Sequence, residues 1–258
     1  MSNLEGGIVN TPENGIDSKN VLFFEASQLP LKRTQTPYQT ESRSAQGPII
    51  LMGGGVKMSN SIFSYISDMV EKSISVVTAG TTIPEERFEE MADALYRMGV
   101  LHIFHIKANT SEFDRKRMLG LSRGIYVVGG DQRRLAANSR SNRLGEDVRM
   151  HNLYGGVFVG TSAGASIAGS KMPVGHGNIS NGWGLVRGYV DQHLDERNRL
   201  PRMLNAVDRV GKGIAPDRNT ACVIQSGQIT GVIGEGSVHV VWRDRRNLSK
   251  ALFVASIK

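Results

Sequence analysis

The stretch Val157-Phe158-Val159-Gly160-Thr161-Ser162-Ala163-Gly164-Ala165 decides the fold of this chain. An apolar run ends at Gly160, and small residues follow Ser162 at the start of a helical pattern. A buried strand that turns tightly into a helix is the building unit of a parallel sheet covered by helices. The glycines beside Ser162 allow the close backbone approach that such a turn requires.

Working outward, further short apolar runs precede this stretch, and several of them end in glycine: 48–52, 73–77, 100–106 and 124–128. Continuous apolar runs of about five residues are typical of strands buried on both faces. Amphipathic helical patterns separate them, such as the one that Pro84 opens. We therefore predict an α/β fold, a three-layer, doubly wound and mostly parallel sheet with helices on both faces. Beyond about residue 170 the pattern is less regular, and 185–190 and 238–242 are expected to extend the same sheet with some antiparallel pairs.

Residues 1–46 differ in composition from the rest of the chain. They are rich in Ser, Asn, Thr, Gln and Glu, and their main apolar island is Val21-Leu22-Phe23-Phe24. Such a polar segment buries too little apolar surface to fold alone. We predict an N-terminal arm over 1–46, partly disordered or docked through its island, followed by a single α/β domain over 47–258.

The chain carries a formal net charge of +7, from 31 Lys and Arg against 24 Asp and Glu. A basic balance is compatible with nucleic acid or an acidic ligand. The basic residues are spread along the chain with few aromatics among them, and no zinc-finger spacing or RNA-binding signature is present. We therefore expect a solvated basic surface and no nucleic-acid partner.

The cysteine content and the hydropathy of the chain predict its cellular compartment. The single cysteine, Cys222, cannot form an internal disulfide, which favours a reducing compartment. No apolar run approaches the ~18 residues needed to span a membrane, and no charged-then-apolar signal pattern is visible at the N-terminus. The sequence therefore predicts a cytoplasmic protein with no membrane partner.

The segment around Ser162 also matches the G-x-S-x-G nucleophile elbow. In this motif the serine adopts a strained backbone geometry that exposes its hydroxyl. The helix that follows directs backbone N–H groups at whatever binds the serine, so the N–H of Ala163 is expected to stabilise an oxyanion. The plainer alternative is an ordinary glycine-rich turn between strand and helix.

A nucleophilic serine needs a base, and the chain offers six histidines. His193 follows a predicted strand within Asp191-Gln192-His193-Leu194-Asp195-Glu196-Arg197-Asn198-Arg199-Leu200-Pro201-Arg202, a run dense in functional groups. His102 and His105 lie three apart on a predicted strand and face opposite sides, which makes joint metal ligation unfavourable. His193 is therefore the predicted base, although a charged, solvated turn would have a similar composition.

Three segments together resemble the cyanophycinase family: 129–135, 160–165 and 191–202. Cyanophycinases are serine peptidases related to aspartyl dipeptidases. They hydrolyse a poly-aspartate whose side chains carry arginine in isopeptide linkage. The resemblance covers about residues 47–240 and implies a dimeric hydrolase that needs no metal or other cofactor. It further implies a peptide or isopeptide substrate that contains Asp and Arg or Lys, cleaved through an acyl-enzyme.

The resemblance also assigns roles residue by residue. Ser162 would be the nucleophile and His193 the base. Backbone N–H groups of Ala163 and of the turn at Gly130 and Asp131 would form the oxyanion site. The substrate pocket would be lined by Gln132, Asp191, Gln192, Arg197, Arg199 and Arg202. Guanidinium groups grip carboxylates in bidentate fashion, which suits this role.

One position departs from the family. A glutamate usually orients the histidine, but here the corresponding segment has Arg218 in its place, directly after Asp217. An arginine cannot accept the imidazole N–H, and a nearby cation disfavours the imidazolium formed in catalysis. We therefore expect Asp217 to serve as the third member of a triad. The alternative is a catalytically impaired or repurposed binding protein on the same scaffold.

A nucleotide-binding alternative arises from the glycine run 53–55 followed by Lys57. This loop lacks the four-residue insert and the G-K-[ST] order of a P-loop. The hydrolase interpretation is therefore favoured.

Overall fold

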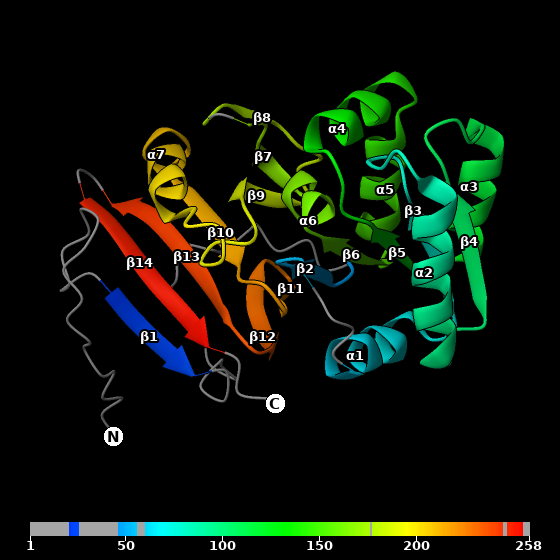
Figure 1. Ribbon diagram of the computed structural model, residues 1–258, viewed down its shortest axis with the longest axis horizontal. Helices are drawn as coiled ribbons and strands as arrows, with labels where there is room; N and C mark the ends of the chain where they lie inside the picture. The colour runs from blue at the N-terminus through cyan, green and yellow to red at the C-terminus, as the bar shows by residue number, and fades with distance from the viewer. Residues whose placement is uncertain (1–20, 26–45, 56–59, 176, 245–246, 255–258) are drawn as a thin grey trace.

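The computed structural model describes residues 21–25, 46–55, 60–175, 177–244 and 247–254. Within this part of the chain, the strands form two seven-stranded sheets that lie beside each other (Figure 1). Most of the predicted arm over 1–46, and positions 56–59 of the glycine-rich loop, fall outside the described residues. The strand Val21–Glu25, which contains the apolar island, pairs in parallel with Asn247–Val254.

The central sheet is mostly parallel. Its order is β12 (Gln228–Gly234), β11 (Thr220–Gln225), β2 (Ile49–Met52), β6 (Val157–Thr161), β5 (Gly124–Val127), β3 (Ser73–Val77) and β4 (His102–Ile106). The five strands from β2 to β4 are parallel, and β11 and β12 add an antiparallel edge. The four predicted apolar runs and the run before Ser162 are the five parallel strands. β2, β3, β5 and β6 are buried almost throughout, as expected for strands covered on both faces, whereas β4 lies at the edge of the sheet and is partly exposed.

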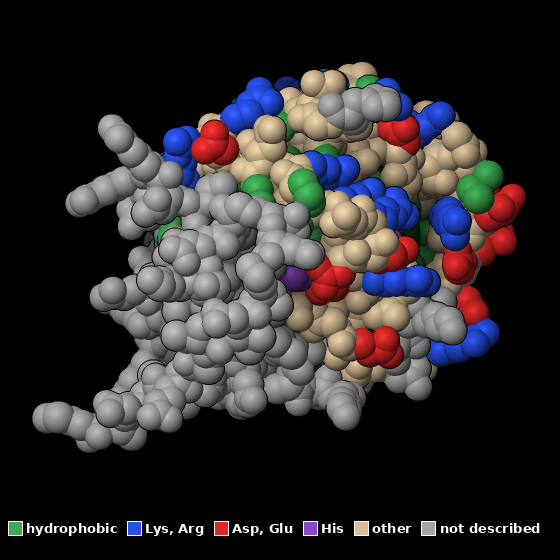
Figure 2. Space-filling view, turned by 60° about the vertical axis from the view of Figure 1, so that its left-hand side comes forward, with side chains coloured by type: hydrophobic (Ala, Val, Ile, Leu, Met, Phe, Trp, Pro, Cys, Tyr) green, Lys and Arg blue, Asp and Glu red, His purple; other side chains and the backbone are tan. Residues whose placement is uncertain are grey.

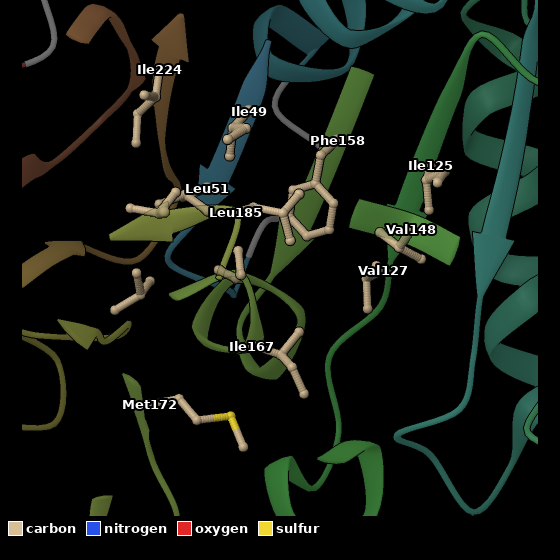
Figure 3. Close-up of a cluster of buried hydrophobic side chains, with 14 of the residues drawn as sticks. Ile49, Leu51, Ile125, Val127, Val148, Phe158, Ile167, Met172, Leu185 and Ile224 are labelled. Carbon is tan, nitrogen blue, oxygen red and sulfur yellow. The ribbon is translucent and has the colours of Figure 1, made fainter. Parts of the chain in front are cut away.

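Helices cover both faces of this sheet, which confirms the predicted fold class. On one face α1 (Asn60–Val70) and α2 (Pro84–Arg97) pack against side chains such as Ile50 and Val76. On the other face lie α3 (Glu112–Leu121), α4 (Gln132–Ser141), α5 (Leu144–Leu153) and α6 (Ala163–Ile167). Figure 3 shows this second cluster, in which Phe158 of β6 and Ile49 of β2 lie with Ile167 of α6 and Met172.

The second sheet has mixed pairing. Its order is β1 (Val21–Glu25), β14 (Asn247–Val254), β13 (Ser237–Asp244), β10 (Lys212–Pro216), β9 (Val186–Val190), β7 (Gly169–Pro173) and β8 (Ile179–Asn181). Helix α7 (Leu200–Val210) packs on it through side chains such as Met203 and Val207 (Figure 1).

The expectation that 185–190 and 238–242 extend the central sheet is therefore wrong, because β9 and β13 belong to the second sheet. The reason lies in α6, which has only five residues. A parallel crossover within one sheet needs a dozen or more residues. After α6 the chain does not add another parallel strand directly; it starts the second sheet with β7 and returns to the central sheet only at β11.

Every helix in the described part of the chain is too short or too polar to cross a membrane. On the face drawn in Figure 2, Lys and Arg side chains are interspersed with Asp and Glu over the described residues. No broad field of one sign covers the described part of this face, which fits the expected solvated basic surface.

Candidate active site

Ser162 sits in the strained turn that the sequence predicts. It follows β6 directly and has φ 51° and ψ −113°, a backbone geometry that is costly for a residue with a side chain. Its N–H donates to the carbonyl of Met52, 3.0 Å away, and so fixes the turn to β2. A side chain at Gly160 or Gly164 would collide with neighbouring backbone, which explains the small residues on either side of Ser162.

His193 lies against this serine, as predicted. Its Nε2 atom is 3.2 Å from the Oγ atom of Ser162. His193 also has a positive φ, 52°, and its N–H donates to the carbonyl of Gly53 at 3.1 Å. A Cβ atom on Gly54 would collide with the imidazole, so the glycine run 53–55 leaves room for the serine–histidine contact.

The carboxylate beside the imidazole belongs to Glu196. Its Oε2 atom is 2.9 Å from Nδ1 of His193, on the far side of the ring from Ser162. The two residues lie three apart in a turn that the N–H of Arg197 helps to close by donating to the carbonyl of His193. Sequence reasoning missed Glu196 because it looked for the acid in the segment of Asp217. The sequence feature that could have identified Glu196 is its position three residues after His193, within a run that already holds many charged residues.

The expectation that Asp217 contacts His193 is wrong. The buried carboxylate of Asp217 instead lies 3.0 Å from Nε2 of His239 and accepts the N–H groups of Ser237 and Asp195. Burial raises the pKa of Asp217, but the hydrogen bonds and charge of His239 outweigh it and leave the pKa below its usual value. Asp217 thus anchors the backbone of the loop that carries His193 and Glu196.

Arg218 stands beside Glu196 and not beside the histidine ring. Its Nη1 atom is 3.8 Å from Oε1 of Glu196, and its Nε donates to the carbonyl of Gly55 at 3.4 Å. The cation therefore contacts the oxygen of Glu196 that does not face His193. Both groups are exposed, so this ion pair contributes little to stability.

The pKa shifts of His193 and Glu196 favour a neutral imidazole that can accept a proton. Burial lowers the pKa of His193 below its ordinary value, while the hydrogen bond to Glu196 works in the opposite direction. The hydrogen bond from His193 lowers the pKa of Glu196, with further lowering from Arg218 and Arg197. At neutral pH the arrangement is therefore a neutral imidazole between a hydroxyl and a carboxylate.

Three backbone N–H groups are expected to form the oxyanion site. Those of Ala163 and of the turn at Gly130 lie beside Ser162, whereas that of Asp131 is used elsewhere. Ala163 is the first residue of α6, so its N–H has no partner within that helix. A Cβ on Gly129 would lie 3.2 Å from Cβ of Ser162, which puts the turn 129–130 beside the nucleophile. The N–H of Asp131, however, donates to the carbonyl of Gly80 at 2.9 Å, and its carboxylate caps α4. Asp131 is therefore a capping residue and not an oxyanion donor.

The residues expected to line the substrate pocket divide into two groups. Asp191 is fully buried and accepts two hydrogen bonds from the guanidinium of Arg202, one of them at 2.7 Å, together with the hydroxyl of Tyr189. This ion pair joins the end of β9 to α7. Asp191 and Arg202 thus hold the loop in place, and their charges are used within the fold.

Arg199 and Gln192 belong to the same largely buried network, whereas Arg197 and Gln132 lie nearer the surface. Arg199 donates to the backbone and side-chain oxygens of Gln192, at 2.9 and 2.6 Å. Arg197 is exposed, four residues after His193. Gln132 begins α4, three residues after Gly129, and is partly buried. Of the expected pocket residues, Arg197 and Gln132 are therefore the best placed to meet a ligand near Ser162.

Comparison with known proteins identifies the family of the chain. Residues 49–232 match the model of peptidase family S51. A cyanophycinase of Nostoc sp. is 35% identical over 143 residues, which are 49% of this chain and 47% of that protein. A cyanophycinase of Synechococcus elongatus is 30% identical over 197 residues, which are 68% of this chain and 60% of that protein. The matched segments thus span about half to three fifths of these relatives.

Solved structures agree on the fold. A peptidase from an acI-B1 Actinobacterium superposes with a TM-score of 0.66 at 19% identity, covering 86% of this chain and 98% of that one. A putative peptidase E protein of Listeria monocytogenes EGD-e superposes with a TM-score of 0.55 at 17% identity, covering 74% and 98%. The family match covers most of the chain, including both Ser162 and His193. The chain belongs to peptidase family S51, a family of serine-type peptidases.

Proposed function

We propose that this protein is a serine hydrolase that cleaves peptide or isopeptide bonds at aspartyl residues. The observation that carries the proposal is the row of contacts from the Oγ of Ser162 through His193 to Glu196, at 3.2 and 2.9 Å. Nucleophile, base and orienting acid in this order are the requirement for activating a serine.

The chemistry follows from these positions. The Oγ of Ser162 attacks the carbonyl carbon of the substrate while its proton passes to Nε2 of His193. The N–H of Ala163, with a second N–H from the turn 129–130, stabilises the oxygen that becomes negative. His193 then gives its proton to the departing nitrogen, and an ester on Ser162 remains. Water, deprotonated by His193, hydrolyses this ester and releases the acid product.

Glu196 has the role that the sequence assigned to Asp217. Its carboxylate accepts the Nδ1 proton of His193, which fixes the tautomer with a free Nε2 and stabilises the imidazolium. Arg218 had favoured a catalytically impaired binding protein, because it occupies the position where an acid is expected. The carboxylate of Glu196 removes that objection, and the hydrolase is the better supported function.

For the substrate, we propose β-aspartyl material that carries Arg or Lys, such as cyanophycin or a dipeptide derived from it. The support is the family of the relatives and the exposed cation of Arg197 in the loop that follows His193. The predicted homodimer and cytoplasmic location remain predictions from sequence.

The test is to incubate the purified protein with cyanophycin and with β-aspartyl dipeptides and to identify the products by mass spectrometry. We expect β-aspartyl-arginine or its amino acids from the wild type and none from Ser162→Ala. Equal products from both proteins would refute the proposal.

A further inference from the structure

A cavity of about 640 Å³ lies at one edge of the second sheet. Arg187 lines it near the start of β9, and Lys212 lines it where β10 begins. Lys212 pairs with Trp242 near the end of the antiparallel β13, so these three strands meet at the same edge. His193 follows the opposite end of β9, and the strand from Val186 to Val190 alone is about 13 Å long. The cavity is therefore separate from the candidate active site.

The side chains around this cavity are predominantly cationic. Five of its ten lining residues are Lys or Arg, and none of these ten described residues is acidic. The cations come from β7, β9, β10, β13 and the end of α7: Lys171, Arg187, Lys212, Arg243 and Arg209. Charges of one sign that gather in a hollow repel one another and attract anions.

Three of these cations have no acidic partner in the described part of the chain. Arg187 and Arg209 are exposed and form no hydrogen bond or ion pair with any other described residue. The ammonium group of Lys171 donates to the amide oxygen of Asn181 at 2.7 Å, which leaves its charge unbalanced. Their positive charges are therefore available to a ligand of opposite sign.

Lys212 shows that the cations lie close enough to repel one another. Burial lowers the pKa of its ammonium group, and the positive charge of Arg187 lowers this pKa further. Arg243, in contrast to Arg187, is paired with an acid, because Oδ1 of Asp208 lies 3.0 Å from its Nη1. An anion bound between Arg187 and Lys212 would offset their repulsion.

The number of charges and the size of the cavity indicate the class of ligand. Two or three linked phosphate groups concentrate several negative charges within a few ångströms, whereas a carboxylate carries only one. A guanidinium group binds phosphate oxygens in bidentate geometry. The cavity is within the range of small-molecule sites, roughly 300–1,000 Å³. A nucleic-acid strand would instead require cations that follow its backbone along a groove.

We propose that this cavity binds a small ligand with two or three linked phosphate groups. Arg187 and Arg209 bind the phosphate oxygens, and Lys171 and Lys212 supply further positive charge. The partly buried Trp242, which also lines the cavity, offers its ring to the base if the ligand is a nucleotide. The inference does not depend on the proposed function, because none of these residues belongs to the candidate active site.

The experiment is isothermal titration calorimetry on the full chain with four probes. These are inorganic triphosphate, ATP, a tetra-aspartate peptide and a single-stranded oligonucleotide. The test variant carries Arg187→Gln and Arg209→Gln. The control carries Arg117→Gln and Arg149→Gln, which remove the same charge from exposed arginines of α3 and α5, outside this cavity. Melting curves establish that every variant is folded.

We expect the control to bind triphosphate like the wild type, and the test variant to bind it about tenfold or more weakly, the scale of losing charged hydrogen bonds. Tetra-aspartate should bind more weakly than triphosphate, because its charges are spread along a longer chain. Tighter binding of ATP than of triphosphate, lost in Trp242→Leu, would identify the ligand as a nucleotide. Equal binding of the two would identify an inorganic polyphosphate.

Four results would overturn the proposal. The first is that neither phosphate ligand binds, and the second is that test and control variants bind triphosphate with equal affinity. The third is that tetra-aspartate binds as tightly as triphosphate, which would remove the preference for phosphate. The fourth is that the oligonucleotide binds more tightly than ATP, which would identify a nucleic-acid surface in place of a small-ligand site.

Discussion

At the scale of single residues, Ser162 and His193 both hold positive φ angles, 51° and 52°. Each such geometry is costly for a residue with a side chain, and it persists only where surrounding contacts fix it. Here the backbone N–H groups of the two residues are tied to the carbonyls of Met52 and Gly53. The strain of both turns thus serves to bring Oγ and Nε2 within 3.2 Å.

The role of Glu196 can be tested by Glu196→Gln. The amide cannot accept a proton or stabilise the imidazolium, so kcat should fall, by up to ~10⁴, the loss that follows when the acid of a trypsin-type triad is replaced by its amide. Thermal unfolding should change little, because Glu196 is exposed. Steady-state kinetics and a melting curve give both numbers. Unchanged kcat would show that another group orients His193.

Arg218→Glu provides a second test of the same assignment. If no acid served His193, this change would restore one and raise the rate. Because Glu196 already contacts Nδ1, we expect no gain, and the new charge should repel Glu196. Arg218→Gln is the control, with an effect below about fivefold for loss of an exposed ion pair. A faster Arg218→Glu enzyme would contradict the account.

The pH dependence follows from the pKa of His193. Burial lowers this pKa, and the neutral imidazole is the active base. The rate constant kcat/KM should therefore rise with pH through a value below the ordinary ~6.5 of histidine. Glu196→Gln removes a contribution that raises the pKa, so the acidic limb should move to still lower pH. A shift of the limb to higher pH would contradict this electrostatic account.

At the scale of elements, the loop between β9 and α7 carries both His193 and Glu196, and two buried ionic groups hold it. Asp191 binds Arg202 of α7, and Asp217 of the loop after β10 binds the N–H of Asp195. These acids were expected to act on substrate or on the histidine. Their burial explains why they do not, since a buried carboxylate must be satisfied by nearby donors.

Arg202→Ala and Arg197→Ala separate support of the loop from contact with substrate. Arg202→Ala leaves Asp191 buried without its main partner and should cost about 3–5 kcal/mol in the free energy of unfolding. Arg197 is exposed, so its truncation should leave stability unchanged and raise KM for a substrate with a carboxylate. Urea unfolding and kinetics on both variants check this. Equal stability of the two would show that the Asp191 contact is unimportant for folding.

Sequence predicts the five parallel strands of the central sheet well, because each lies in a mainly apolar run, but it does not predict the antiparallel strands β11 and β12. It predicts Ser162 for the same reason, since the elbow is a local pattern. Sequence does not identify Glu196 as the acid of the triad, because its role depends on a turn that brings its carboxylate to His193. Its spacing from His193 is also not distinctive among the charged residues around it. The second sheet was missed because the pattern does not reveal that the chain leaves the central sheet after the five-residue α6.

At the scale of the whole molecule, the candidate site is assembled from both sheets. Ser162 follows β6 of the central sheet, whereas His193 follows β9 of the second. The apolar cluster that joins the two sheets includes Phe158 of β6 and Met172 of β7 (Figure 3). It also includes Val190 of β9, so packing between the sheets sets the distance between nucleophile and base. A change that loosens this cluster should reduce activity before it unfolds the protein.

The measurement that tests the central claim most directly is labelling by a fluorophosphonate, which reacts with activated serines, followed by peptide mass spectrometry. We predict one modified residue, Ser162, in the wild type. His193→Ala should slow the labelling strongly, and Ser162→Ala should abolish it. Modification of a different serine, or labelling of the His193→Ala protein at the wild-type rate, would contradict the account.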